Sequence, residues 1–240
     1  MKIRNIIHFG IIVLLCMAAT SCKSSSAKKS TGLISYEMVS ITETNEYLEA
    51  DVTYPQFKKF NSLNKEIARN ISALHDAFKA TAQQSWQEID AMRKSYGATE
   101  NTPPLVHYIS CDPIIAGPQY ISMLFTIYQD EGGAHGETLL QSVTYDTKLK
   151  KTVSITEATG YTIDEIATQC NEYLFANLKY GGDDAESKEA RESWIYDGTM
   201  ADDSNYKIFT YDGKTLTVYF EPYTVAPYAY GVQKVELPAK

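Results

Sequence analysis

The stretch "QYISMLFTIYQDEGGAHGETLLQSVTYD", residues 119–146, decides the class of fold. Its first part alternates apolar side chains with mostly polar ones: Ile121, Met123, Phe125 and Ile127 against Tyr120, Ser122, Thr126 and Tyr128. A period of two residues is typical of an antiparallel strand with one covered face. Residues 137–146 predict a further strand. We therefore expect two strands of an antiparallel sheet, separated by the glycine-rich residues 131–136.

The connection "EGGAHG" is an unusual way to join two strands. Gly132 and Gly133 allow backbone conformations closed to other residues, and Gly136 removes a side chain where another group can approach. His135 is then either an imidazole held at the sheet edge for a ligand, or part of a turn or bulge in which it bonds a neighbouring carbonyl. We favour the turn, and keep Gly132, Gly133 and His135 as candidate ligand-binding residues.

A long helix is predicted ahead of these strands. Apolar residues recur at spacings of three and four, at Phe57, Phe60, Leu63, Ile67, Ile71, Leu74 and Phe78. This pattern, over residues 57–80, is that of an amphipathic helix that packs against a sheet. Trp86, Ile89 and Met92 continue the spacing, either in the same helix or in a second one.

The second half of the chain predicts another helix and a hairpin. Thr162 stands three residues before Glu165 at the start of an apolar-periodic run, a capping box that opens a helix. This helix is expected to end near residues 180–182. Asp212 and Gly213 lie between two alternating segments, which predicts a tight hairpin with positive φ at both residues.

The order of elements indicates the fold class. Strand-like runs at 33–40 and 46–55 precede the first helix, and "YGATENTPP" (96–104) ends it. Because strands come in runs and helices are few, we expect an α+β fold: one or more antiparallel sheets with two main helices packed on one face. The folded body is expected at residues 33–240, as one domain or as two lobes with a boundary near 96–104.

The N-terminus has the features of a lipoprotein signal peptide. Lys2 and Arg4 precede an apolar run of about fifteen residues, which is too short to span a bilayer comfortably. "AATSC" then resembles the bacterial lipobox, so Cys22 is the expected lipidation site after removal of residues 1–21; ordinary secretion is the alternative. The polar residues 22–32 predict a flexible tether. We expect a membrane-anchored lipoprotein of the cell envelope, facing the periplasm or the cell surface.

Charge narrows the class of partner. Without Lys2 and Arg4, 20 basic residues face 30 acidic ones, which is a net charge of −10. Nucleic acid is disfavoured, because neutralising phosphates needs a basic face. A cationic protein would be attracted instead. Residues 181–203, with a net charge of −6, look like an exposed insertion that either assists such an encounter or is only a solvated loop.

Residues suited to catalysis are sparse. Nucleophilic catalysis places a histidine near Ser or Cys with an orienting carboxylate, and the expected mature chain has His75, His107 and His135. The first two fall among apolar positions of a helix and a strand, so we expect them to be structural. Motifs for hydrolases or zinc sites are absent from the sequence, and we assign no catalytic residue, metal ligand or cofactor. Cys111 and Cys170 can form one disulfide or remain two buried thiols.

"VYFEPYTVAPYAYG" (218–231) is the second unusual stretch. Two prolines stiffen a turn that carries Tyr219, Tyr223, Tyr228 and Tyr230. Such rings are enriched at binding surfaces and stack on sugars or on proteins, because they give a large contact area for little lost entropy. The structural alternative is a corner where strands change direction. The candidate ligand-binding residues of this stretch are Glu221, Tyr223, Tyr228 and Tyr230.

Three motifs together resemble a known family: "YPQF" before a long helix, "GGAHG" entering a strand, and "VYFEPYTVAPYAYG" before a final strand. They are similar to the extracytoplasmic domain of RsiV-type lysozyme-sensing anti-sigma factors, which also occurs at the N-terminus of a membrane-anchored peptidoglycan deacetylase. The likeness spans roughly residues 33–238. It implies a domain of mostly unassigned role whose best understood members bind lysozyme. We expect neither sigma-factor binding nor deacetylation, because the segments responsible for these activities are not recognised here.

The leading hypothesis is a lipid-anchored, non-enzymatic binding protein that captures a cationic, lysozyme-like enzyme or cell-wall glycan. One alternative is an enzyme that modifies envelope polymers with His135 as acid or base. Another is a structural lipoprotein for envelope assembly. In the enzyme alternative, His135 activates a reacting group. In the other two hypotheses, His135 and the tyrosines only shape a surface.

Overall fold

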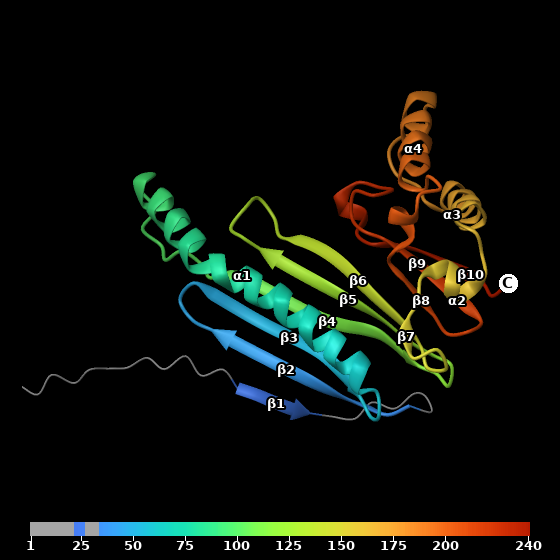
Figure 1. Cartoon of the computed structure of the whole chain (residues 1–240). Coiled ribbons are helices and arrows are strands. Elements are labelled where there is room, and N and C mark those ends of the chain that lie inside the picture. Colours follow the sequence, from blue (N-terminus) through green and yellow to red (C-terminus); the bar gives the residue numbers. More distant parts are fainter. Residues whose placement is uncertain (1–21, 27–33) are drawn as a thin grey trace, which may run out of the picture.

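The computed structural model describes residues 22–26 and 34–240; the expected signal peptide and residues 27–33 lie outside the described residues. Two sheets form the framework (Figure 1). The larger sheet holds its strands in chain order: β1 (Cys22–Ser26), β2 (Tyr36–Thr44), β3 (Leu48–Phe57), β4 (Leu105–Ala116), β5 (Tyr120–Asp130), β6 (Glu137–Asp146) and β7 (Lys151–Thr152). Residues 22–26 of the expected tether thus pair with β2, whose edge offers free backbone donors and acceptors.

The strands β3 and β4 are parallel, whereas all other neighbours in the larger sheet are antiparallel. Parallel neighbours need a long crossover connection, and helix α1 (Asn61–Ser95) provides it. The antiparallel strand predicted at 120–128 is confirmed, because β5 and β6 pair in register from Tyr120 opposite Asp146 to Gln129 opposite Glu137. The expectation of one covered face was wrong for its first half, because Tyr120, Ser122 and Leu124 are buried as well.

Helix α1 is one continuous helix of 35 residues, so the spacing that continued at Trp86 belongs to the same helix. Its buried stripe faces the sheet and consists of Leu63, Ile67, Ile71, His75, Phe78 and Ala82. A helix of this length measures about 52 Å, whereas a ten-residue strand such as β3 measures about 33 Å. The C-terminal part of α1 therefore extends beyond the sheet (Figure 1).

The smaller sheet has the order β10–β9–β8 and carries the remaining helices. Its strands are β8 (Phe209–Tyr211), β9 (Thr215–Phe220) and β10 (Gln233–Pro238), and the helices are α2 (Ile155–Thr159), α3 (Ile163–Asn177) and α4 (Ala185–Gly198), with short 3-10 helices η1 (Asp203–Tyr206) and η2 (Tyr228–Tyr230). Both sheets with their helices confirm the predicted α+β class. Residues 96–104, by contrast, connect α1 to β4 within the larger sheet, and the chain passes to the smaller sheet only after Thr152.

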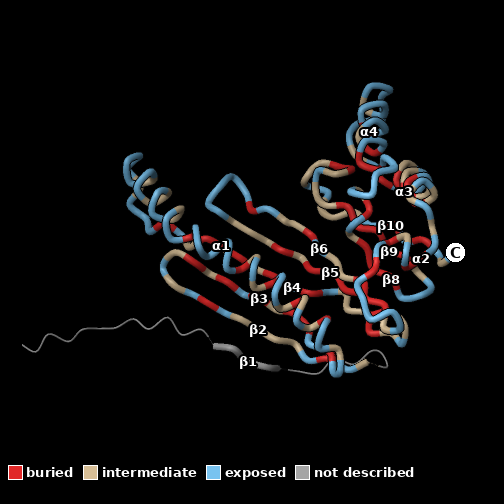
Figure 2. Tube along the Cα trace, in the orientation of Figure 1, coloured by how far each residue is buried: buried red, intermediate tan, exposed pale blue. Residues whose placement is uncertain are grey.

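Each sheet has its own buried core, and a small apolar cluster of Leu124, Leu140 and Tyr219 joins the two (Figure 2). Polar contacts reinforce this junction. The Oγ of Ser122 accepts a hydrogen bond from the Tyr211 amide at 3.0 Å and lies 2.7 Å from the Thr144 hydroxyl. Since Ser122 and Thr144 are buried, these contacts satisfy groups that would otherwise destabilise the junction.

The capping box at the start of α3 is confirmed. The Thr162 hydroxyl accepts from the Glu165 amide at 3.2 Å, and the Glu165 carboxylate accepts from the Thr162 amide at 2.8 Å. Most of the segment 181–203 is exposed, as expected, but it is not a solvated loop, because Ala185–Gly198 form α4. Asp184 caps this helix, and packing of a few residues such as the buried Ile195 stabilises a sequence that is rich in charged residues.

The hairpin predicted at Asp212 and Gly213 is confirmed by the pairing of β8 with β9. Positive φ occurs at Gly213 alone, not at both residues as predicted. Asp212 instead accepts hydrogen bonds from the amides of Lys214 and Thr215, each at 2.7 Å. Cys111 and Cys170 are free thiols. Cys111 is buried in the core of the larger sheet, and Cys170 in the core of the smaller sheet.

Candidate binding surface

The glycine-rich residues 131–136 connect β5 to β6 at one end of the larger sheet. Gly132 has φ +77°, and its amide donates to the Asp130 carboxylate at 2.9 Å. A Cβ at Gly132 would lie 2.8 Å from Cδ1 of Ile89 on α1. The positive φ therefore favours glycine at 132, and a Cβ there would also make the end of the Ile89 side chain shift, whereas a Cβ at Gly133 would meet nothing closer than 3.9 Å.

His135 contacts the carbonyl of the next residue, as the favoured structural interpretation predicts. Its Nδ1 lies 2.9 Å from the Gly136 carbonyl oxygen, and because a carbonyl can only accept, Nδ1 carries the proton. The ring also stacks on Tyr228, with centroids 4.4 Å apart and planes 26° apart. The Tyr228 hydroxyl donates to the same Gly136 oxygen at 2.8 Å. The two unusual stretches of the sequence therefore meet in space.

Tyr223 is the most exposed tyrosine of the second stretch. Its φ of +70° is costly for a bulky side chain, and its ring is 55% exposed. Trp194 of α4 donates its indole N–H to the Tyr223 carbonyl at 2.9 Å, and the Tyr223 ring lies 5.5 Å from that of Tyr228. The first contact holds the backbone of Tyr223, and the second places one side of its exposed ring against Tyr228.

Tyr230 contacts a second group of aromatic residues, which consists of Tyr180 and Trp194. Its ring lies 5.4 Å from Tyr180, whose ring in turn lies edge-on to Trp194 at 6.0 Å. The Tyr180 hydroxyl donates to the Val225 carbonyl at 3.1 Å, and burial raises its pKa. Arg191 donates to the Tyr180 carbonyl, with its guanidinium 5.9 Å from the ring centroid. We call His135, Tyr180, Trp194, Tyr223, Tyr228 and Tyr230 the aromatic patch.

Sequence reasoning missed Tyr180 and Trp194. Trp194 had one weak signal, because it is a large aromatic residue within an acidic stretch. One candidate has a structural contact: the Glu221 carboxylate accepts from the Leu140 amide at 2.5 Å and so ties the smaller sheet to β6. Gly136 is needed for space, because a Cβ there would lie 2.3 Å from the Tyr128 hydroxyl.

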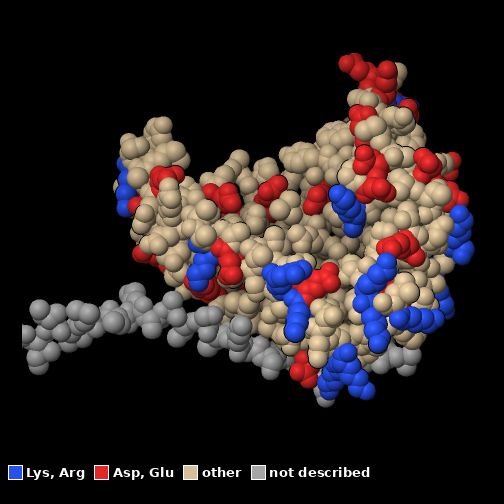
Figure 3. Space-filling view, in the orientation of Figure 1, with Lys and Arg blue, Asp and Glu red and all other residues tan. Residues whose placement is uncertain are grey.

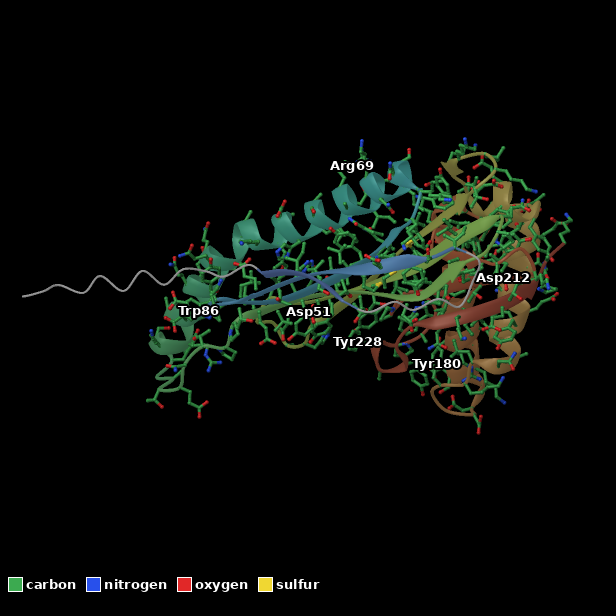
Figure 4. All side chains as sticks on the ribbon, turned by 90° about the horizontal axis from the view of Figure 1, so that it is seen from below. Asp51, Arg69, Trp86, Tyr180, Asp212 and Tyr228 are labelled. Carbon is green, nitrogen blue, oxygen red and sulfur yellow. The ribbon has the colours of Figure 1, made fainter. Side chains whose placement is uncertain are left out.

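The face of the larger sheet opposite α1 is open and polar over β2, β3 and β4, whereas the smaller sheet covers part of it over β5 and β6. Asp51, Tyr228 and Tyr180 lie on this side, whereas Arg69 lies on the outer side of α1 (Figure 4). A depression of about 480 Å³ occupies the face over β2, β3 and β4; we call it the trough, and its polar lining is Thr42, Thr44, Glu49, Asp51, Thr53, Tyr108 and Ser110. Tyr108 stacks on Tyr128 with centroids 6.2 Å apart.

The other two histidines lie between α1 and the larger sheet: His75 belongs to α1 and His107 to β4. His75 and His107 stack with centroids 5.5 Å apart, and Phe78 stacks 4.7 Å from His107. Burial lowers the pKa of both, that of His107 to about 4. In residues 22–26 and 34–240, no group of three or more His, Cys, Asp or Glu side chains is arranged to hold a metal ion.

Acidic side chains lie on α4, the helix that contributes Trp194 to the aromatic patch. Asp and Glu gather on the projecting end of α4, and Lys and Arg on the lower part of the molecule in this view (Figure 3). None of the helices in the described part of the chain combines the length and apolar character needed to cross a bilayer.

Two family models match consecutive parts of this α+β chain. Residues 41–138 match the family described as "Deacetylase PdaC", and residues 149–240 match "Protein of unknown function (DUF3298)". The change from one match to the other falls between residues 138 and 149, near the passage of the chain from the larger to the smaller sheet. These matches are compatible with the expected RsiV-like family but do not confirm it.

One solved structure shares this fold, and a second is reported beside it. A DUF3298 family member from Bacteroides fragilis NCTC 9343 matches with a TM-score of 0.61 and 15% identity, over 88% of this chain and 92% of that chain. A DUF3298 family protein from Pseudomonas aeruginosa PAO1 matches with a TM-score of 0.48 and 15% identity, over 92% and 90%. No curated protein matches the chain.

Proposed function

We propose that this protein is a lipid-anchored docking protein of the cell envelope, which captures a basic, lysozyme-like enzyme on its aromatic patch without catalysing a reaction. The anchor is Cys22, and the folded body faces the periplasm or the cell surface. The observation that carries the proposal is the convergence of His135 and the tyrosine–proline segment in one exposed, immobilised surface.

The patch supports binding because its rings are ordered in advance. Interfaces lose affinity when side chains must be immobilised, and rings already held by backbone contacts avoid that cost. Tyr228, Tyr180 and Trp194 each donate to a main-chain carbonyl. Tyr223 and Tyr230 remain 55% and 44% exposed, so a partner can cover them.

Charge supports a basic partner. The net charge of −10 expected after removal of residues 1–21 favours association with a cationic protein at low ionic strength. Acidic residues on α4 lie beside Trp194, within the same helix as part of the patch. The resemblance to lysozyme-sensing domains points to the same class of partner.

The arrangement around His135 favours binding over acid–base catalysis. Its Nδ1 is engaged with Gly136, and one face of its ring is covered by Tyr228. Glu221, a candidate carboxylate from the neighbouring segment, is engaged with the Leu140 amide. The histidine thus contributes to the shape of the patch.

Retention on immobilised hen egg-white lysozyme tests the proposal. The full chain, purified in detergent, is expected to bind at low salt and to elute as the salt concentration rises. Dissolved ions screen the attraction between the two proteins, and the Debye length is only about 10 Å at an ionic strength of about 0.1 M. Tyr223→Asn is the informative variant, since asparagine tolerates positive φ. It should weaken binding about tenfold, as expected for loss of an interface aromatic ring.

The matched control is Tyr96→Asn, because Tyr96 is 86% exposed and lies after α1, outside the patch. It should bind like the unchanged chain. Equal retention of all three proteins, or retention of none at any salt concentration, contradicts the proposal.

A further inference from the structure

The trough is a second feature, separate from the aromatic patch. In an antiparallel sheet an uncovered face is commonly solvated, and long charged side chains often cover it. Here the paired residues across the face are short or aromatic. One row runs from Thr42 through Asp51, Tyr108 and Tyr128 to Thr138 on five successive strands.

The neighbouring row has the same character: Ser40 pairs with Thr53, Ser110 pairs with Thr126, and Thr53 and Ser110 both line the depression. Neither row contains lysine or arginine, so short hydroxyl side chains form a floor that is lower than its aromatic and acidic surroundings. This explains the depression of about 480 Å³ over β2–β4. Its volume falls within the range of roughly 300–1,000 Å³ typical of small-molecule sites.

The polar groups of the trough are placed to accept hydrogen bonds. The Tyr108 hydroxyl donates to the Glu49 carboxylate, which fixes that side chain against the ring. Asp51 stands opposite Tyr108 in the register and opposite Thr42 on the other side, and it is exposed. Two carboxylates beside an aromatic ring and several hydroxyls match a ligand with many hydroxyl donors and an apolar ring face.

Tyr128 supports Tyr108, whose ring forms an aromatic wall of the trough. Its ring stacks on Tyr108 at 6.2 Å, and the absence of a side chain at Gly136 leaves space for its hydroxyl. The Tyr108 ring is thus held between Glu49 and Tyr128. A wall fixed in this way can pack against a sugar ring with little loss of side-chain entropy.

We propose that the trough binds a neutral oligosaccharide, with Tyr108 as the aromatic wall and Asp51 and Glu49 as acceptors for sugar hydroxyls. The site is independent of protein capture by the aromatic patch. Neutral saccharides fit better than anionic ones, because two carboxylates line the trough and its lining has no basic residue.

Titration calorimetry with three tetrasaccharides tests this proposal: cellotetraose, N-acetylated chitotetraose and the glucosamine tetramer. The full chain is used in a detergent without a sugar headgroup. We expect at least one of the two neutral sugars to bind. Asp51→Asn should weaken that binding about tenfold, because the aspartate provides charge-assisted hydrogen bonds.

Glu37→Gln is the matched control, since Glu37 is another exposed acid on a strand of the same sheet but lies outside the trough. It removes the same charge and should leave binding unchanged. Thr42→Tyr is a second variant that fills the trough while keeping both carboxylates, and it should also weaken binding about tenfold.

Absence of binding for both neutral sugars, or equal weakening by Glu37→Gln, would overturn the proposal. Binding of the glucosamine tetramer alone would do so too, because it would show only attraction of cations. Tyr223→Asn should leave saccharide binding intact, and Asp51→Asn should bind lysozyme like Glu37→Gln. Failure of one proposal is therefore distinguishable from failure of the other.

Discussion

The His135 ring stacks on the Tyr228 ring, and both side chains hydrogen-bond the same carbonyl oxygen, that of Gly136. One residue comes from a connection of the larger sheet and the other from a 3-10 helix attached to the smaller sheet. This contact joins the two sheets beside the exposed rings that we propose as a docking surface, so stability and binding are linked there.

The first prediction concerns the glycines of the β5–β6 connection. Gly132→Ala should lower the free energy of unfolding by about 1–2 kcal/mol, because alanine is strained at φ +77° and its Cβ would press on Ile89. Gly133→Ala should change it by less than about 0.5 kcal/mol. Urea unfolding of both variants measures the difference, and equal effects would refute the explanation given for Gly132.

The second prediction concerns acid stability. Burial and, to a smaller extent, the nearby His75 together lower the folded pKa of His107 to about 4. The folded state therefore stays neutral at His107 while the unfolded state takes up a proton below about pH 6.5. Stability should be complete above that pH and fall by about 2 kcal/mol between pH 7 and pH 5 from His107 alone.

Groups facing His75 adjust the size of this effect without reversing it. Burial lowers the pKa of His75, Glu43 and Asp76 oppose that shift, and Lys79 adds to it. Urea unfolding at several pH values measures the slope. His107→Phe, which cannot titrate, should flatten it, and an unchanged slope in that variant would assign the acid sensitivity to other groups.

The third prediction concerns Arg191, which is buried and donates to the Tyr180 carbonyl. Arg191→Gln should destabilise the protein by roughly 1–3 kcal/mol, because a charged hydrogen bond at a buried site is lost. Lys188→Gln on the exposed side of α4 is the control and should be near neutral. Lysozyme retention should fall in the first variant only, since Tyr180 supports Tyr230 in the patch.

The fourth prediction tests the capping box of α3. Thr162→Ala should cost about 1 kcal/mol, because its hydroxyl satisfies the Glu165 amide in the first turn. Thr168→Ala, within the same helix, removes a hydroxyl that only bonds back to the Asp164 carbonyl. It should be neutral or slightly stabilising. Thermal unfolding of the two variants compares them directly.

Elements with a local sequence signal could be predicted. The strand β5, the apolar stripe of α1 and the Thr162 capping box each have a signal in neighbouring residues, and each element is present in the structure. The burial of both faces in the first half of β5 had no such signal, because it depends on the smaller sheet. Helix α4 had no comparable apolar period, so its sequence resembled a solvated loop. Its formation depends on packing of Ile195 and the close approach of Gly198 to Thr224.

The sites depend on contacts that sequence spacing does not encode. His135 and Tyr228 were each recognised as unusual, but their stacking follows from the way the smaller sheet sits on β5 and β6. The trough depends on strand register, because Asp51 and Tyr108 become neighbours only through the parallel pairing of β3 with β4. The pairing of His75 with His107 arises in the same way from the packing of α1.

The parallel pairing of β3 with β4 also constrains how the chain can be assembled. A nascent chain can form the β2–β3 hairpin early, but β3 gains its second neighbour only after α1 and residues 105–116 have left the ribosome. Such non-local pairing slows folding and leaves an apolar strand uncovered for longer. For the exported protein that we propose, such a delay would leave the larger sheet open while the chain crosses a membrane.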